Sequence, residues 1–238
     1  MKRIVHKADT RGFANHGWLK SHHTFSFASY QNPERMSFGV LRVLNDDVVQ
    51  PKMGFGTHPH QNMEIISIPL QGALSHKDSM GNKRAIEVGE IQVMSAGTGL
   101  THSEFNDSKT NEVNFLQLWI IPEELNVEPN YEQRQFYSEE KRNLLQTVVA
   151  PKDKLESNAL PISQQAYIYR IRLDLDNTID LKVKSKQNGF YIFVVNGGVE
   201  VANTSLNKRD AIGVYETDNV TIKANVSSEL IIIEVPMN

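Results

Sequence analysis

Residues 54–70 read Gly-Phe-Gly-Thr-His-Pro-His-Gln-Asn-Met-Glu-Ile-Ile-Ser-Ile-Pro-Leu, which is a glycine-rich turn, a histidine pair and a short apolar run. The run from Glu64 to Leu70 is rich in isoleucine and too short for a typical helix, so it predicts a strand. His58 and His60 precede this strand, and side chains two apart on extended chain point to the same face. Pro59 favours extended backbone at His58. We therefore expect both imidazoles to face one side of a sheet.

A second histidine-containing segment lies about forty residues further along the chain. Residues 95–106 hold a Gly-Thr-Gly turn followed by His102 and Glu104, again two apart. Two neighbouring strands would then supply two ligands each. Imidazole nitrogen and carboxylate oxygen suit Fe, Mn, Co, Ni, Cu or Zn. A single His-x-His pair is often only a pair of buried or surface histidines, but the two segments together predict a metal site with ligands His58, His60, His102 and Glu104.

The rest of the chain has the rhythm of antiparallel β-structure. Turn-forming residues, including Asn45-Asp46-Asp47, recur about every 8 to 12 residues between apolar runs, which is typical of sandwiches and barrels. Two groups of short runs predict strands and make the chain all-β: residues 39–44, 64–70, 90–94 and 114–121, then 167–173, 190–195, 198–201 and 230–235.

The two groups of strands indicate two domains. Residues 1–135 form the first, 136–165 a proline-containing and acidic connection with short helical pieces, and 166–238 the second. An offset of about 125 residues aligns Pro69–Gly72 with Val194–Gly197 and superposes two Asn-Lys-Arg triplets, which favours an internal duplication. All eight histidines lie at or before His102. The second domain therefore has no histidine metal site.

Composition excludes several classes of partner and location. The net charge is −3 and no run of Lys or Arg exceeds two residues, so direct binding to nucleic acid is not expected. No segment approaches the ~20 consecutive apolar residues of a membrane span. There is no cysteine. We expect a monomer in the cytoplasm whose metal ligands are histidines and carboxylates.

Several motifs resemble those of the pirin family, which belongs to the cupin superfamily. They are Arg11-Gly-Phe-Ala-Asn-His-Gly-Trp18, His23-Thr-Phe-Ser-Phe27, Phe55-Gly-Thr-His-Pro-His60, Asp78-Ser-Met-Gly-Asn82 and Ser95-Ala-Gly-Thr-Gly99. The resemblance implies two tandem cupin-type β-barrels, with the family's three histidines and one glutamate at His58, His60, His102 and Glu104. General cupins take their carboxylate from a position that corresponds to Glu64, so Glu64 is a weaker alternative ligand or a group that holds a ligand in place.

Bacterial pirins resemble quercetinases, dioxygenases that open the central ring of flavonols with O2 and release CO. The resemblance thus implies this activity, with Glu104 as the base that takes the flavonol's 3-hydroxyl proton. Fe(II) is the expected ion, with Mn, Co, Ni, Cu or Zn as alternatives. One rival is a metal-binding, redox-responsive regulatory module that acts through a protein partner. Another is a cupin that uses its metal for isomerisation or hydrolysis.

A flat aromatic substrate requires a partly apolar cavity beside the metal. Each candidate for its wall is a large apolar residue of the first domain, for which burial in the core is the ordinary alternative. His16, His22 and His23 belong to the N-terminal segment and could orient a substrate, although a structural role is preferred, and His76 is expected in solvent. The wall candidates are Phe25, Phe27, Phe38, Phe55, Met63, Met94, Phe115 and Trp119.

Overall fold

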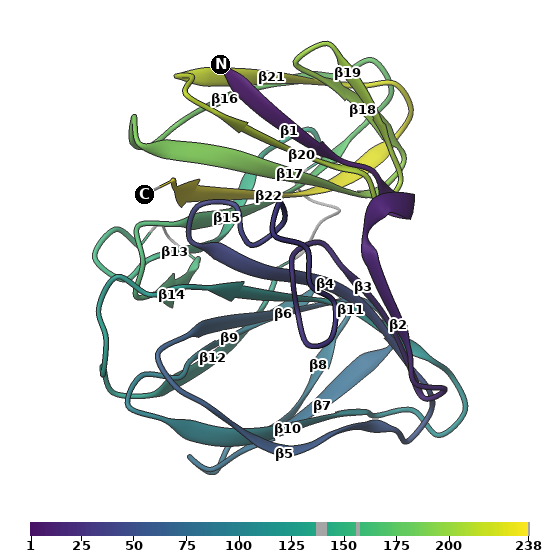
Figure 1. Ribbon diagram of the computed structural model, residues 1–238, viewed down its shortest axis with the longest axis vertical. Helices are drawn as coiled ribbons and strands as arrows, with labels where there is room; N and C mark the ends of the chain where they lie inside the picture. Colours follow the sequence, from purple (N-terminus) through teal and green to yellow (C-terminus); the bar gives the residue numbers. More distant parts are fainter. Residues whose placement is uncertain (137–141, 156–157, 238) are drawn as a thin grey trace.

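The chain folds into two β-barrels stacked on one another (Figure 1). This computed structural model describes residues 1–136, 142–155 and 158–237. The predictions of an all-β chain and of two tandem cupin-type barrels are confirmed, and every strand predicted from the sequence is present. The prediction of short connecting helices is wrong for the described residues, where the single helical element is the 3-10 turn Ala8–Thr10. None of these residues forms a helix long and apolar enough to cross a membrane.

The first barrel consists of a seven-stranded sheet and a four-stranded sheet. In spatial order the larger sheet contains β12 (Asn130–Gln135), β9 (Glu90–Ser95), β6 (Glu64–Gln71), β11 (Val113–Ile120), β4 (Leu41–Val49), β3 (Leu19–His23) and β2 (Gly12–Asn15). The smaller sheet contains β5 (Gly54–His60), β10 (Leu100–Asn106), β7 (Ala73–Asp78) and β8 (Lys83–Glu87).

The second barrel has the same two-sheet composition. Its larger sheet contains β1 (Lys2–His6), β20 (Ala211–Tyr215), β17 (Asn188–Asn196), β22 (Ser228–Pro236), β15 (Tyr167–Leu173), β13 (Gln146–Pro151) and β14 (Leu160–Ile162). Its smaller sheet contains β16 (Thr178–Lys182), β21 (Asn219–Ala224), β18 (Gly198–Val201) and β19 (Thr204–Asn207).

The strand orders of the two barrels match position by position. Strands β9, β6, β11 and β4 of the first occupy the places of β20, β17, β22 and β15 in the second. The equivalent turns after β6 and β17 also share a glycine with positive φ. Gly72 has φ of 77° and Gly197 has φ of 87°, a conformation that favours glycine. The structure therefore has the architecture of an internal duplication.

The expected domain limits differ from the strand pairing at two places. Strand β1 opens the chain but pairs with β20 of the second barrel. Strands β13 and β14, within the expected connection, extend the second barrel's large sheet through β15. Residues 137–141 and 156–157 of that connection lie outside the described residues. These pairings are long-range, so local sequence does not encode them.

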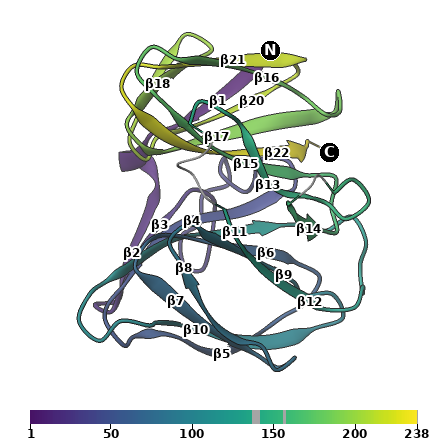
Figure 2. The ribbon, with the colours of Figure 1, turned by 180° about the vertical axis from the view of Figure 1, so that it is seen from behind.

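The largest core lies between the barrels. The two seven-stranded sheets face each other (Figures 1 and 2), and residues such as Ile66, Leu118, Ile168 and Ile231 form one buried cluster from both. Strand β6 is thus covered on both faces, with Ile66 in the inter-barrel core and Ile65 inside the first barrel. This explains why its sequence is a continuous apolar run rather than an alternating pattern.

Candidate metal site and adjoining cavity

The first barrel brings three histidines together through the pairing of β5 with β10. His58 lies directly opposite His102 in this antiparallel pair, and His60 lies opposite Leu100. Between the pairs His102/His58 and Glu104/Phe55, β5 has one residue more than β10, which is a β-bulge. The bulge bends β5, so Phe55 and His58 line one cavity although they are three residues apart.

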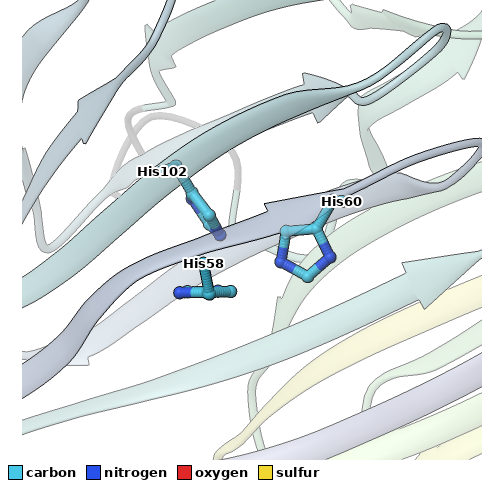
Figure 3. A group of neighbouring side chains, drawn as sticks. All are labelled: His58, His60 and His102. Carbon is cyan, nitrogen blue, oxygen red and sulfur yellow. The ribbon is translucent and has the colours of Figure 1, made fainter.

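The three imidazoles are near enough to share one ion. Ring centroids of His58 and His102 are 4.4 Å apart, and His60 lies 4.9 Å from each of the other two. One ring nitrogen from each residue lies within 4.8 Å of the others. Figure 3 shows His58 and His60 on one strand and His102 on its neighbour, all three directed to a common point.

The protonation and hydrogen bonding of these histidines fit metal coordination. Burial lowers the pKa of His60 to about 4 and that of His102 to about 2, so both rings are neutral near pH 7. His58 Nδ1 lies 2.7 Å from the Gly56 carbonyl oxygen, which as acceptor fixes the proton there and leaves Nε2 free. Neither nitrogen of the buried His102 has a hydrogen-bond partner among the described residues. An unpaired buried imidazole is what a metal ligand leaves when no ion is present.

Glu104 is buried beside this cluster and anchored by two side chains. Gln117 Nε2 donates to Glu104 Oε2 at 2.9 Å, and Ser67 Oγ lies 3.0 Å from Glu104 Oε1. Burial raises the pKa of Glu104, and nearby histidines and these hydrogen bonds oppose the shift. The carboxylate oxygen, His102 and His76 form a second group whose ligand atoms lie within 4.8 Å of one another.

His76 was expected in solvent, and that expectation is wrong. It is 1% exposed on β7, where it pairs with Glu104 of β10. Its Nε2 lies 3.1 Å from Asp78 Oδ2, and its ring lies 4.7 Å from that of Tyr131. The strand alternates, with Leu74, His76 and Asp78 buried, and this period of two was the available sequence signal.

Glu64 lies away from the histidine cluster. It accepts a hydrogen bond from Ser95 Oγ at 2.6 Å and is three residues from Ser67, so the two side chains leave β6 on opposite faces. Burial raises the pKa of Glu64 to about 6. Neither group of potential metal ligands among the described residues includes it.

A cavity of about 350 Å³ adjoins the cluster, within the ~300–1,000 Å³ range of small-molecule sites. His58, His60, His102 and Glu104 all line it. Of the eight apolar wall candidates, the cavity is lined by Phe27, Phe55 and Trp119. A larger hollow of about 720 Å³, beside Ile121 and Lys184, contains no histidine.

The other five wall candidates do not line this cavity. Phe25 and Phe38 belong to the inter-barrel core, where both rings pack against Tyr191. Phe115 packs in a separate cluster with Leu19. Met94 is fully buried in another cluster, against which Met63 packs. All five side chains pack in or against apolar clusters rather than on the cavity wall, and hydrophobicity alone does not distinguish these two kinds of position.

Four polar residues complete the cavity wall, and of these only His23 was among the predicted candidates for orienting a substrate. Ser21 and His23 of β3 and Asn45 and Asp47 of β4 line it, and all four are buried. The prediction of a turn at residues 45–47 is wrong, because β4 runs through them. Burial raises the pKa of Asp47 to about 7. The sequence signal was the apolar run on both sides of this polar triplet, which marks a strand with a buried polar face.

The other two N-terminal histidines that were candidates for orienting a substrate, His16 and His22, differ in their place relative to this cavity. His16 is on its wall. His22 follows Ser21 on β3 and is not part of the wall, and its ring is tilted against that of Phe13 with 4.8 Å between the ring centroids.

The chain is similar in sequence and in structure to several known proteins. The family described as Pirin matches residues 5–120, and the family described as Quercetinase C-terminal cupin domain matches residues 147–235. A protein of Escherichia coli named quercetin 2,3-dioxygenase is 40% identical over 98% of both chains. A pirin-like protein of Caulobacter vibrioides is 37% identical over 95% of this chain and 96% of its own. The crystal structure of an Escherichia coli bacterial pirin in complex with nickel(II) is similar, with a TM-score of 0.93, 39% identity and full coverage of both chains.

Proposed function

The chain belongs to the pirin family, and on that premise we propose that it is a metal-dependent dioxygenase that opens the central ring of flavonols, such as quercetin, with O2 and releases CO. One observation carries the proposal. Three histidines, two of them neutral by burial, and a buried glutamate face a single cavity whose wall includes Phe27, Phe55 and Trp119. The full-length relative named quercetin 2,3-dioxygenase supports the same reaction.

We assign His58, His60, His102 and Glu104 as the metal ligands. A bound divalent ion would act as a Lewis acid that stabilises a deprotonated substrate oxygen. Fe(II) is the proposed ion, and Mn, Co, Ni, Cu and Zn are the alternatives because imidazole and carboxylate accept all of them. Buried His76 completes the surroundings, since its ring lies 5.4 Å from that of His102.

Glu104 is the proposed base. It takes the proton of the flavonol's 3-hydroxyl, and its buried environment, which raises its pKa, lets it hold that proton. Ser67 and Gln117 keep its two oxygens in place. The aromatic residues of the cavity limit access of water to the reacting ring.

The test is flavonol turnover on protein of known metal content. Quercetin loss and CO release are followed on the purified protein, on chelator-stripped protein and on protein reloaded with one metal at a time. We expect metal-dependent release of one CO for each flavonol consumed. A tightly bound metal without turnover would contradict the proposal and favour the regulatory module.

Two substitutions separate ligation from proton transfer. His102→Ala should lose bound metal and turnover together, because a ligand is removed. Glu104→Gln should keep part of the metal but lose turnover by ~100-fold or more, because the amide cannot take a proton. His22→Leu is the matched control, a histidine outside the cavity that should keep both. Full turnover in Glu104→Gln would assign the base elsewhere.

A further inference from the structure

A row of polar side chains crosses the inner face of the first barrel's large sheet. Direct cross-strand pairing sets Ser67 of β6 beside Gln117 of β11, Gln117 beside Asn45 of β4, and Asn45 beside His23 of β3. Paired residues on neighbouring strands share one face of a sheet. The row thus begins at the two residues that hold Glu104 and continues across two further strands, along the cavity wall.

The two ends of this row differ in their hydrogen bonding. Ser67 and Gln117 are bonded to Glu104, whereas Asn45 Oδ1 and His23 Nδ1 have no partner in the described part of the chain. Asp47 Oδ1, two residues along β4 on the same face, is also unpartnered. The three residues are 2%, 3% and 4% exposed, in the order Asn45, His23, Asp47. Buried polar atoms are nearly always paired, so three unpaired atoms on one cavity wall indicate a partner that enters the cavity.

A continuous line of rings joins this end of the cavity to the histidine cluster. His60 lies 5.0 Å from Trp119, Trp119 lies 5.3 Å from Phe27, and Phe27 lies 5.3 Å from His23, each distance between ring centroids. All four line the cavity. A flat aromatic molecule can lie along this wall, with one end at the cluster and the other beside the unpaired atoms.

We propose that His23, Asn45 and Asp47 form a hydroxyl-recognition subsite, which binds phenolic hydroxyl groups at the end of the aromatic substrate remote from the histidine cluster. The inference rests on the proposed function for the flavonol scaffold. The amide oxygen of Asn45 is an acceptor, and the Asp47 carboxyl, whose pKa burial raises to about 7, accepts when ionised and can donate when protonated. A phenolic hydroxyl both donates and accepts, so it can pair with either group. The described cavity lining contains no lysine or arginine, so an anionic group has no counter-charge there.

Such a subsite distinguishes flavonols with hydroxyl groups at this end from those without them, because its own polar atoms stay unpaired when a ligand without hydroxyl groups binds. A ligand without hydroxyls would bury Asn45 Oδ1 and Asp47 Oδ1 against carbon, which costs more than the loss of an exposed hydrogen bond. The subsite therefore sets a preference among flavonols that share the metal-binding ring.

The experiment compares two flavonols with the same metal-binding ring. Quercetin carries phenolic hydroxyls on its other rings, and 3-hydroxyflavone carries none. Dissociation constants are measured without O2 on metal-loaded protein, through quenching of the fluorescence of Trp18 and Trp119, the two cavity tryptophans. We expect quercetin to bind ~10-fold or more tightly than 3-hydroxyflavone, and Asn45→Leu or Asp47→Leu to lower that ratio by ~3- to 10-fold each. Because no turnover is needed, absence of CO release would contradict the proposed function and leave this measurement intact.

Matched variants separate recognition from structure. His23→Leu should lower the ratio, and His22→Leu, next on the same strand but outside the cavity wall, should not. Asn45→Asp keeps an acceptor and should retain most of the preference. Thermal unfolding is the second readout: Asn45→Leu should keep or raise Tm, because it removes an unpaired buried oxygen. An unchanged ratio in both Asn45→Leu and Asp47→Leu, or equal weakening of both flavonols with a lowered Tm, would overturn the subsite.

Discussion

At the scale of single residues, burial decides which form each titratable group of this chain takes. His60 and His102 are held neutral by burial, which keeps their nitrogen lone pairs available to an ion. Glu64 and Glu104 are both buried carboxylates, but Glu64 lies on β6 of the larger sheet and Glu104 on β10 of the smaller sheet. Glu104 is bonded to Ser67 and Gln117 beside the histidines, whereas Glu64 is bonded to Ser95 on the inter-barrel side.

Glu64 gives a pH-dependent prediction for stability. Burial raises its pKa from an ordinary 4.5 to about 6, so the folded state binds its proton more tightly than the unfolded state does. The stabilising contribution is complete below pH 4.5 and is lost as pH rises through 6. The variant Glu64→Gln cannot ionise at this position and does not lose this contribution. The difference in free energy of unfolding, Glu64→Gln minus wild type, should therefore increase by about 2 kcal/mol from low to neutral pH.

Urea unfolding at a series of pH values measures this difference directly. The exposed Glu124 provides the matched control, because Glu124→Gln makes the same chemical change at a carboxylate outside the core. A flat difference for Glu64→Gln would show that the pKa of Glu64 is the same in the folded and unfolded chain, and a falling difference would show that folding lowers it.

At the scale of elements, strand β1 has an unusual place. It takes the edge position of the second barrel's large sheet, next to β20, although it opens the chain (Figure 1). In the first barrel the matching edge is covered by β12, which follows the barrel in sequence. In the second barrel that edge is taken by β1, a strand that precedes the first barrel in sequence. His6 anchors it, with Nδ1 2.7 Å from the Tyr191 hydroxyl oxygen.

Removal of residues 2–6 tests this role. The change exposes the backbone donors and acceptors of β20, and an uncovered edge pairs readily with other chains. We expect a loss of about 2 to 5 kcal/mol from the missing ladder hydrogen bonds, with concentration-dependent association. Chemical unfolding and size-exclusion chromatography measure the two effects. Lys2→Ala is the control, because its ion pair with Glu216 is exposed and contributes little. A truncated chain that is monomeric and of wild-type stability would refute the role.

At the scale of the whole molecule, the barrels are joined by apolar packing and by one buried ionic network. Asp46 of β4 lies 3.0 Å from Arg209 Nε of the second barrel and 3.7 Å from Arg11. Asn114 donates to Asp46 Oδ1 at 2.7 Å and accepts from Arg209 at 2.9 Å. Asp46 is adjacent in sequence to Asp47 of the cavity, so the network also fixes the strand that carries the proposed subsite.

Asp46→Leu should destabilise the whole protein by about 3 to 5 kcal/mol, because two largely buried guanidinium groups lose their anionic partner. Thermal and chemical unfolding report the loss. Glu124→Leu is the matched control: it breaks the exposed Lys152–Glu124 pair, where the side chains are 53% and 64% exposed, and should change stability by less than about 1 kcal/mol. Equal effects of the two substitutions would mean that the buried network does not hold the barrels together.

Local sequence was sufficient to predict the strands and most turns, and to predict which ligand candidates point to the same face of a strand. Whether His58 and His60, or His102 and Glu104, share a face follows from the two-residue period of extended chain, which is a local property. The run Glu64–Leu70 and its counterparts in the second half predicted strands for the same reason, and the recurring glycine turns indicated two barrels.

Only the tertiary structure decided which strands are neighbours, and the cavity follows from that. The register that sets His58 against His102, the burial of His76, the row from Ser67 to His23 and the place of β1 all depend on contacts between residues distant in sequence. Asn45 and Asp47 resembled a turn because polar residues are common in turns. They lie in a strand because β4 pairs with β3 on one side and β11 on the other, and their side chains face a cavity. Periodicity fixes the side of a strand to which a residue points, whereas the surroundings on that side come from the fold.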